Sequence, residues 1–87
     1  MPLVWIPKAM QTYTGGRETV EMEGRNVRRL IVALDETYPG VKDALMDGDR
    51  FKPGIAVAVN GQVSHLGPLQ PLEEDNEVFF VPAIGGG

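Results

Sequence analysis

The chain ends in Gly85, Gly86 and Gly87, which follow an apolar segment that closes with Ile84. A chain end carries the only backbone carboxylate of a protein, and residues without a Cβ atom can enter a slot too narrow for any other side chain. A free carboxylate is a poor electrophile, so chemistry at Gly87 requires activation, most simply as an acyl-adenylate made from ATP. The sequence predicts that Gly87 reacts, that Gly85 and Gly86 thread into a partner, and that the partner activates the carboxylate.

Glycine runs are also common in flexible linkers, so the alternative interpretation is that this ending is a flexible segment without a function of its own. The residues before it favour a functional tail. Residues 77–81 form a strand-like run of aromatic and β-branched residues, and Pro82 and Ile84 stand between this run and the glycines. A linker would not normally begin in this way.

Other residues that could do chemistry are scarce. The chain contains no cysteine, which excludes thiolate nucleophiles, disulfides and cysteine-bound metal centres. The one histidine, His65, lies in a loop-like stretch and cannot form a metal site without several oxygen ligands, so we expect it to be exposed to solvent. The sequence therefore predicts no metal site, and any sulfur that the protein handles cannot be held on a side-chain thiol.

Charge is distributed unevenly along the chain. The first 52 residues hold all eight Lys and Arg residues and eight of the twelve acids, so the net charge of −4 comes from Glu73, Glu74, Asp75 and Glu77. This pattern argues against a nucleic-acid partner, whose phosphates would be repelled. It favours a partner with a basic surface near the point where it receives the tail. A solvated acidic turn is the alternative.

Length and composition indicate one domain. Eighty-seven residues with 43% apolar and 23% charged content are typical of a globular chain with a modest core. No stretch approaches the roughly 20 apolar residues that span a bilayer, and the first residues lack the pattern of a signal peptide. We expect a domain over residues 1–81, a flexible tail over 82–87, a cytoplasmic location and no membrane partner.

Residue patterns predict several strands and one main helix. Strands are expected over residues 3–7, 19–23, 55–59 and 77–81, and Asn60-Gly61 is typical of a hairpin turn into a further strand. Apolar residues with helical spacing over 27–38 follow Asn26, a favoured N-cap, and a short second helix over 41–46 is a candidate. This order predicts an α+β domain with the β-grasp, or ubiquitin-like, fold: a mixed sheet of four to five strands with one main helix packed across one face.

Alternation along the strands predicts which side chains face the helix. Val78 and Phe80 are expected in the core, together with residues 55, 57 and 59 and the helical residues Leu30, Ile31 and Leu34. Trp5 is expected to pack in the core or at an edge. The opposite face of the sheet would then carry an exposed apolar platform that binds a partner, made of Ala56, Ala58, Phe79 and Val81, with Ile84 beside it in the tail.

The chain as a whole resembles a known family, and three segments carry the resemblance. The strand 56–61, the acidic turn 74–78 and the ending 80–87 are similar to the MoaD/ThiS family of sulfur carrier proteins. The family usually ends in Ala-Gly-Gly, so Gly85 replaces an alanine and leaves the terminal Gly86-Gly87 pair in place. Shorter motifs in the first half of the chain, Thr14-Gly15-Gly16 and Tyr38-Pro39-Gly40 among them, look most like the carriers that serve a cysteine synthase.

The resemblance implies a carrier protein rather than an enzyme, with no catalytic residue and no stably bound cofactor. It also implies a two-step mechanism. An E1-like adenylyltransferase would use ATP and Mg²⁺ to adenylate Gly87, and a sulfur donor such as a rhodanese or a cysteine desulfurase would convert it to a thiocarboxylate. The carrier would then deliver sulfide to a biosynthetic synthase. Because the chain looks most like the carriers that serve a cysteine synthase, the implied pathway is cysteine biosynthesis. Three alternatives stay open: the small subunit of molybdopterin synthase, a thiazole-pathway carrier, and a ubiquitin-like modifier that forms isopeptide bonds through Gly87.

Overall fold

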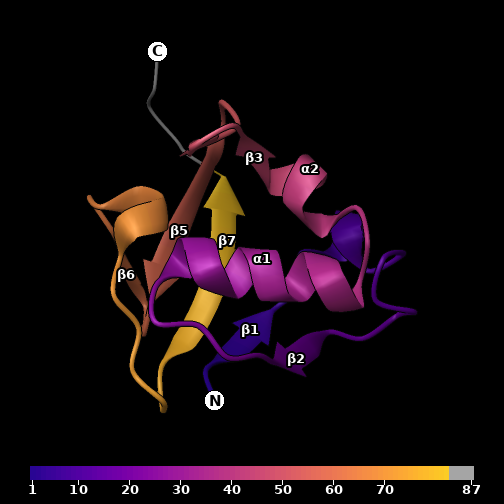
Figure 1. Cartoon of the computed structure of the whole chain (residues 1–87), viewed down its shortest axis with the longest axis horizontal. Coiled ribbons are helices and arrows are strands. Elements are labelled where there is room, and N and C mark those ends of the chain that lie inside the picture. Colours follow the sequence, from indigo (N-terminus) through magenta and orange to yellow (C-terminus); the bar gives the residue numbers. More distant parts are fainter. Residues whose placement is uncertain (83–87) are drawn as a thin grey trace.

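Strand β7 lies at the centre of a five-stranded mixed sheet (Figure 1). The computed structural model describes residues 1–82. Strand β7 pairs with β1 in the parallel direction and with β5 in the antiparallel direction. The outer strands β2 and β6 then pair antiparallel with β1 and β5. The sheet order is β2-β1-β7-β5-β6, with bounds β1 Leu3–Trp5, β2 Thr19–Glu21, β5 Ile55–Val59, β6 Gln62–Val63 and β7 Glu77–Pro82.

The main helix α1, Val27–Thr37, crosses one face of this sheet (Figure 1). Asn26 has extended backbone angles, and its side-chain Oδ1 accepts a hydrogen bond from the backbone N–H of Arg29 at 2.8 Å, which confirms the predicted N-cap. The helix ends one residue earlier than predicted because Tyr38 leaves the helical conformation, although its N–H still donates to the carbonyl of Leu34.

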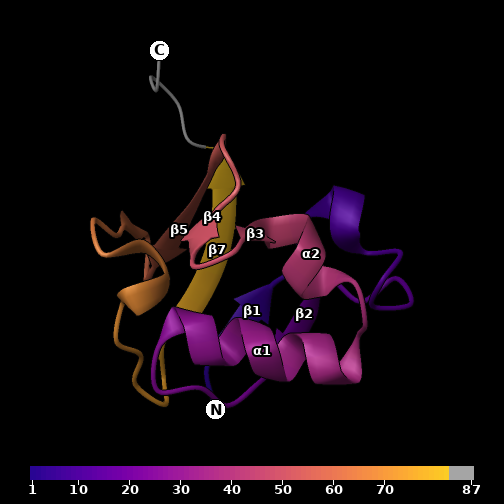
Figure 2. The same cartoon turned by 45° about the horizontal axis from the view of Figure 1, so that its top comes forward.

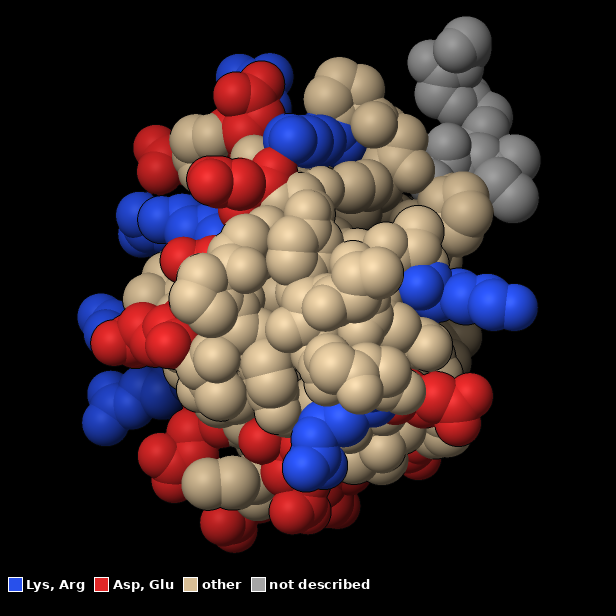
Figure 3. All heavy atoms as spheres, turned by 90° about the vertical axis from the view of Figure 1, so that its right-hand side faces the viewer, with Lys and Arg blue, Asp and Glu red and all other residues tan. Residues whose placement is uncertain are grey.

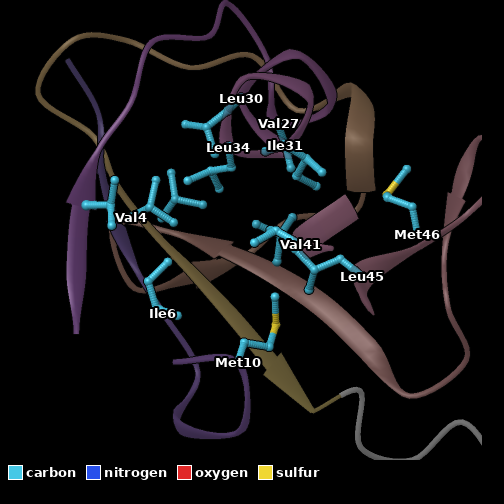
Figure 4. Packing of buried hydrophobic residues seen from close by; sticks show 13 residues of the cluster. Val4, Ile6, Met10, Val27, Leu30, Ile31, Leu34, Val41, Leu45 and Met46 are labelled. Carbon is cyan, nitrogen blue, oxygen red and sulfur yellow. The ribbon is translucent and has the colours of Figure 1, made fainter. Parts of the chain in front are cut away.

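The core lies between α1 and the sheet. Figure 4 shows Leu30 and Leu34 pointing from the helix toward Val4 of β1, while Val41 and Leu45 close one side. These side chains are essentially inaccessible to solvent, as are Val57 and Val78 on the sheet. Phe80 is half-buried and packs against this cluster. The predicted core is therefore confirmed for Leu30, Ile31, Leu34, Val57 and Val78. Ile55 and Phe80 lie at its margin, and Val59 is half-buried and does not join the cluster.

Several short elements differ from the sequence prediction. The first strand ends at Trp5 rather than residue 7, since Pro7 cannot donate a ladder hydrogen bond and begins a turn into the 3₁₀ helix η1, Lys8–Met10. The second helix is confirmed as α2, Val41–Leu45, and a second 3₁₀ helix, η2, spans Gly67–Leu69. A two-residue hairpin, β3 Met46–Asp47 with β4 Arg50–Phe51, was not predicted and lies near the end of β7 (Figure 2).

The Asn60-Gly61 turn joins β5 to β6 as predicted. Both residues have positive φ, 50° and 85°, which Asn and Gly tolerate better than other residues. The topology as a whole is the predicted β-grasp fold, with a five-stranded mixed sheet and one main helix on one face. Within residues 1–82, no helix has the length and apolar character needed to cross a membrane.

Candidate functional site

The end of β7 leads directly to the glycines. Pro82, the last described residue, lies opposite Ile55 in the β5–β7 ladder, so the strand is one residue longer than predicted. Ile84, Gly85, Gly86 and Gly87 lie outside the described residues, and their predicted roles stay predictions. The site that the structure describes is therefore the surface of the sheet next to this end.

The two faces of β7 are assigned as the sequence predicted. Val78 is fully buried beneath α1, and Phe80 packs its ring at 6.2 Å from that of Phe51 in an edge-to-face arrangement on the same side. Phe79 and Val81 alternate with them and therefore point to the opposite face, where they lie across from Ala58 and Ala56. The four predicted platform residues are thus brought together on the face of the sheet away from the helix.

Trp5 also belongs to this face, which the sequence analysis missed. It lies opposite Phe79 in the parallel β1–β7 ladder, and the two rings stack with centroids 5.5 Å apart and planes only 8° from parallel. Its indole N–H donates to the carboxylate of Glu77 at 2.9 Å, which fixes the ring over its neighbour. Trp5 remains 39% exposed, so the expectation of a core or edge-packing residue is wrong: Val4 takes the inward position of β1, and Trp5 points to the face of the sheet away from α1.

Val63 extends the same row on the other side. It lies opposite Ala58 in the β5–β6 ladder and is 58% exposed. Residues directly opposite on neighbouring strands point to the same face. A single apolar row therefore runs across four strands in the order Trp5, Phe79, Ala58, Val63. We call the whole set the platform: Trp5, Ala56, Ala58, Val63, Phe79 and Val81.

Ala58 departs from the prediction in one respect. It was expected to be exposed, but it is buried although it does not join the core beneath α1. Phe79 and Val63 flank it on both sides, and their larger side chains screen its single methyl group from solvent. Ala58 therefore forms the floor of the platform, and the accessible contacts come from its larger neighbours.

The acidic turn lies at the other end of β7 from the tail. Glu73, Glu74 and Asp75 precede the strand, and Glu77 is its first residue, whereas the tail follows its last residue. The turn is held by Asn76, whose Oδ1 accepts the N–H of Glu73 at 2.7 Å. The sequence analysis placed this charge beside the entry of the tail into a partner. That placement is wrong, because proximity along the chain is lost when a strand of six residues intervenes.

His65 is exposed, as predicted. Across residues 1–82, no three or more His, Asp and Glu side chains gather in a group that could hold a metal ion.

Comparisons with known proteins place this geometry in a family. The model of the ThiS family matches residues 4–87. The sulfur carrier protein CysO of Mycobacterium tuberculosis is 31% identical over 97% of this chain and 96% of its own length. The chain belongs to the ThiS family.

Solved structures agree with the fold of this ThiS family member. The chain superposes with a TM-score of 0.90 and 27% identity on a chain of the Amycolatopsis orientalis BexX/CysO complex, with both chains covered completely. It superposes with a TM-score of 0.87 and 24% identity on Mycobacterium tuberculosis CysO, covering 97% of this chain and 100% of the other. The ThiS family match runs to residue 87, so it includes β7, the platform residues and the terminal glycines.

Proposed function

We propose that this chain is a sulfur carrier whose C-terminal carboxylate, on Gly87, is converted to a thiocarboxylate. The observation that carries the proposal is the ThiS family match through the glycine ending, with a sulfur carrier protein 31% identical over nearly the whole chain. The absence of cysteine is consistent with it, because the sulfur then has to be held on the backbone carboxylate rather than on a side-chain thiol.

The chemistry requires an activating enzyme, a sulfur donor and an acceptor synthase. In the first step an oxygen of the Gly87 carboxylate attacks the α-phosphorus of Mg-ATP on an E1-like adenylyltransferase, and pyrophosphate leaves. In the second step a sulfide equivalent attacks the acyl carbon, and AMP leaves with the acyl oxygen. A rhodanese or a cysteine desulfurase would supply this sulfur in the cytoplasm as a protein persulfide: its terminal sulfur attacks, AMP leaves, and a second thiol reduces the resulting acyl disulfide and so releases the thiocarboxylate. The product thiocarboxylate then passes its sulfur to a synthase, which we propose acts in cysteine biosynthesis.

The platform is proposed as the surface that docks on these partners. Ordering three glycines in a slot costs roughly 1 to 2 kcal/mol per residue, or about 3 to 6 kcal/mol together. Burial of apolar surface contributes about 25 cal/mol per Å², so offsetting the cost of ordering the glycines requires burial of roughly 200 Å² of apolar surface at the interface. Exposed Trp5 and Val63 and half-buried Phe79 and Val81 can supply apolar surface next to the strand that carries the tail. Aromatic side chains of this kind commonly dominate binding energy at interfaces.

Mass spectrometry of the intact chain tests the proposed function. After incubation with the E1-like enzyme, Mg-ATP and a sulfide source, we expect a gain of about 16 Da, the difference between sulfur and oxygen, because a positioned carboxylate is activated and then attacked. Deletion of Gly86-Gly87, or addition of one residue after Gly87, should abolish the gain, since the reactive group no longer lies at the nucleotide. A gain that persists in either variant would remove the terminal carboxylate from the mechanism.

A further inference from the structure

Phe51 of the β3–β4 hairpin covers the inner side of β7 near its end. Its ring meets the ring of Phe80 edge-to-face, with centroids 6.2 Å apart, and both side chains pack against the core cluster. Figure 2 shows α1 crossing β7 below the end of the strand, and β4 in front of the part that extends beyond the helix. The helix therefore covers the first half of β7, where Val78 is fully buried, and the hairpin covers the half that leads to the tail.

The hairpin holds Phe51 in a fixed position. Met46, the residue opposite Phe51 in the hairpin, is buried in the core cluster. The N–H of the next residue, Lys52, donates to the carbonyl of Leu45 at 2.9 Å. On its other side the ring lies against η2, since a Cβ atom at Gly67 would stand 3.8 Å from it. Phe51 is thus a half-buried ring between η2 and β7.

The end of β7 has little backbone pairing of its own. The register with β1 stops at Phe79, opposite Trp5, whereas the register with β5 continues to Pro82, opposite Ile55. Within residues 1–82, the last three residues of the strand therefore pair on one side only. Pro82 also has no N–H to donate to the ladder. Side-chain packing has to supply the support that β1 no longer gives.

Charge does not hold this end of the strand. Within residues 1–82, the ion pairs join the amino group of Met1 to Glu74 and Arg28 to Asp49, and none of these residues belongs to β7. Figure 3 shows acidic side chains gathered at the lower end of the molecule and side chains of both signs at the upper end. The position of the end of β7 therefore depends on packing, and Phe51 is the aromatic ring packed there.

We infer that Phe51 is a positioning residue for the activation of Gly87. By packing on Phe80, it keeps the end of β7 in the ladder and so fixes the point from which the tail leaves the sheet. The inference rests on the proposed function and deepens it by naming a residue, on the face away from the platform, that acts on the reaction through β7.

The expected effect follows from the length of chain that the partner has to order. If residues 81 and 82 left the ladder, the slot would have to order residues 81–87 instead of 83–87. Each further residue lowers the fraction of docked carrier whose carboxylate reaches the nucleotide by roughly 5- to 30-fold. Loss of the Phe51 ring should therefore slow the reaction of carrier that is already docked through the platform.

Amide hydrogen exchange of the free carrier tests the structural part of the inference. The N–H of Asn60 donates to the carbonyl of Glu77 at 2.9 Å, and hydrogen-bonded pairs recur at every second residue of an antiparallel ladder. The amides of Phe79 and Val81 are therefore bonded to β5 as well. In Phe51→Ala, exchange at Val81 should accelerate about tenfold more than exchange at Phe79, because the end of the strand opens locally.

Kinetics with the purified E1-like adenylyltransferase, Mg-ATP and a sulfide source test the functional part. In Phe51→Ala, kcat of the mass gain should fall about tenfold, while KM for the carrier should stay within about threefold because the platform is unchanged. Phe51→Tyr keeps the ring and should restore kcat. Phe51→Leu should give an intermediate kcat, and it allows the measurement if Phe51→Ala does not fold.

Leu72→Ala is the matched control for loss of stability. Leu72 is also half-buried and packs against the same core cluster, but it lies beside Met1 and Glu74, before the start of β7. Its truncation should lower the free energy of unfolding without changing kcat, and it should not separate the exchange of Val81 from that of Phe79. Circular dichroism of each variant verifies that it is folded.

Four outcomes would overturn the inference: a wild-type kcat in folded Phe51→Ala or Phe51→Leu, an equal loss of kcat in Leu72→Ala, a rise in KM alone, or equal acceleration of exchange at Val81 and Phe79. The proposed function is tested separately by the mass gain of the wild type. A gain together with an unchanged kcat in the Phe51 variants refutes this inference alone, and no gain in the wild type refutes the proposed function whatever the exchange rates.

Discussion

Phe79 and Phe80 are neighbours on β7 that point to opposite faces, and this arrangement offers a sharp test of the platform. The same substitution, Phe→Ala, can be made at both positions. Phe79→Ala should mainly weaken binding to the activating partner, whereas Phe80→Ala should mainly lower stability. Each variant is the chemical control for the other, because the two differ by one position in the chain and by the face of the sheet.

The expected cost at Phe79 follows from its contacts. Its ring stacks on Trp5 at 5.5 Å and is half-buried on the outer face. Such a pair contributes about 0.5 to 1.5 kcal/mol beyond its burial, so we expect a loss of about 1 to 2 kcal/mol in the free energy of unfolding. Truncating an aromatic anchor at the centre of an interface costs about 2 kcal/mol or more in binding, equivalent to roughly 30-fold in Kd.

At Phe80 we expect a large loss of stability and little loss of partner binding. The ring packs against the core and edge-to-face on Phe51 at 6.2 Å. Fully buried Phe→Ala substitutions cost about 3 to 5 kcal/mol, and the partial exposure of Phe80 places it near the lower limit, at about 3 kcal/mol. For a domain of this size that loss lowers Tm by roughly 10 to 20 °C. The folded molecules should still bind the partner within about threefold of the wild type, because the platform is unchanged.

Two measurements decide between these outcomes. Urea unfolding followed by circular dichroism gives the stability of each variant, and calorimetric titration with the activating partner at 25 °C gives Kd, corrected for the folded fraction. The reasoning would be refuted if Phe80→Ala weakened binding more than Phe79→Ala did, or if Phe79→Ala left Kd unchanged. Either result would mean that partners dock elsewhere, whatever the exposure of the platform.

Three further predictions concern the scaffold that positions the platform. Leu34→Ala should cost about 2 to 5 kcal/mol in denaturant unfolding because the side chain is fully buried, while Val32→Ala on the exposed side of the same helix should cost little; a loss below about 0.5 kcal/mol at Leu34 would contradict the core assignment. Asn26→Ala should lower the free energy of unfolding by about 1 kcal/mol through loss of the N-cap, with Asn26→Ser retaining most of it; equal stability of both variants would show that the cap contributes nothing. Gly40→Ala should lower Tm, because φ is 106° and a Cβ atom would meet the Tyr13 ring at 2.6 Å, and an unchanged Tm would mean that this loop shifts without cost.

The sequence by itself determined the features that depend on local spacing. The apolar stripe of 27–38 and the cap residue Asn26 predicted helix α1 to within one residue. Alternation along β7 separated Phe79 from Phe80, and Asn60-Gly61 marked a hairpin, because each signal acts within a few residues of the chain. The glycine ending and the lack of cysteine are the sequence features on which the proposed chemistry at the terminal carboxylate rests.

The tertiary structure decided which distant residues meet. Trp5 and Phe79 are 74 positions apart, and only the parallel pairing of β1 with β7 brings their rings together. Ala58 is buried because the larger side chains of Phe79 and Val63 flank it on the two neighbouring strands. The sequence around Ala58 does not reveal these neighbours. The acidic turn is only a few residues from Pro82 in sequence yet lies at the other end of β7, while Ile55 is far from Pro82 in sequence yet lies opposite it. Strand order and direction set these distances, and they follow from the long-range pairing of the sheet rather than from any local pattern.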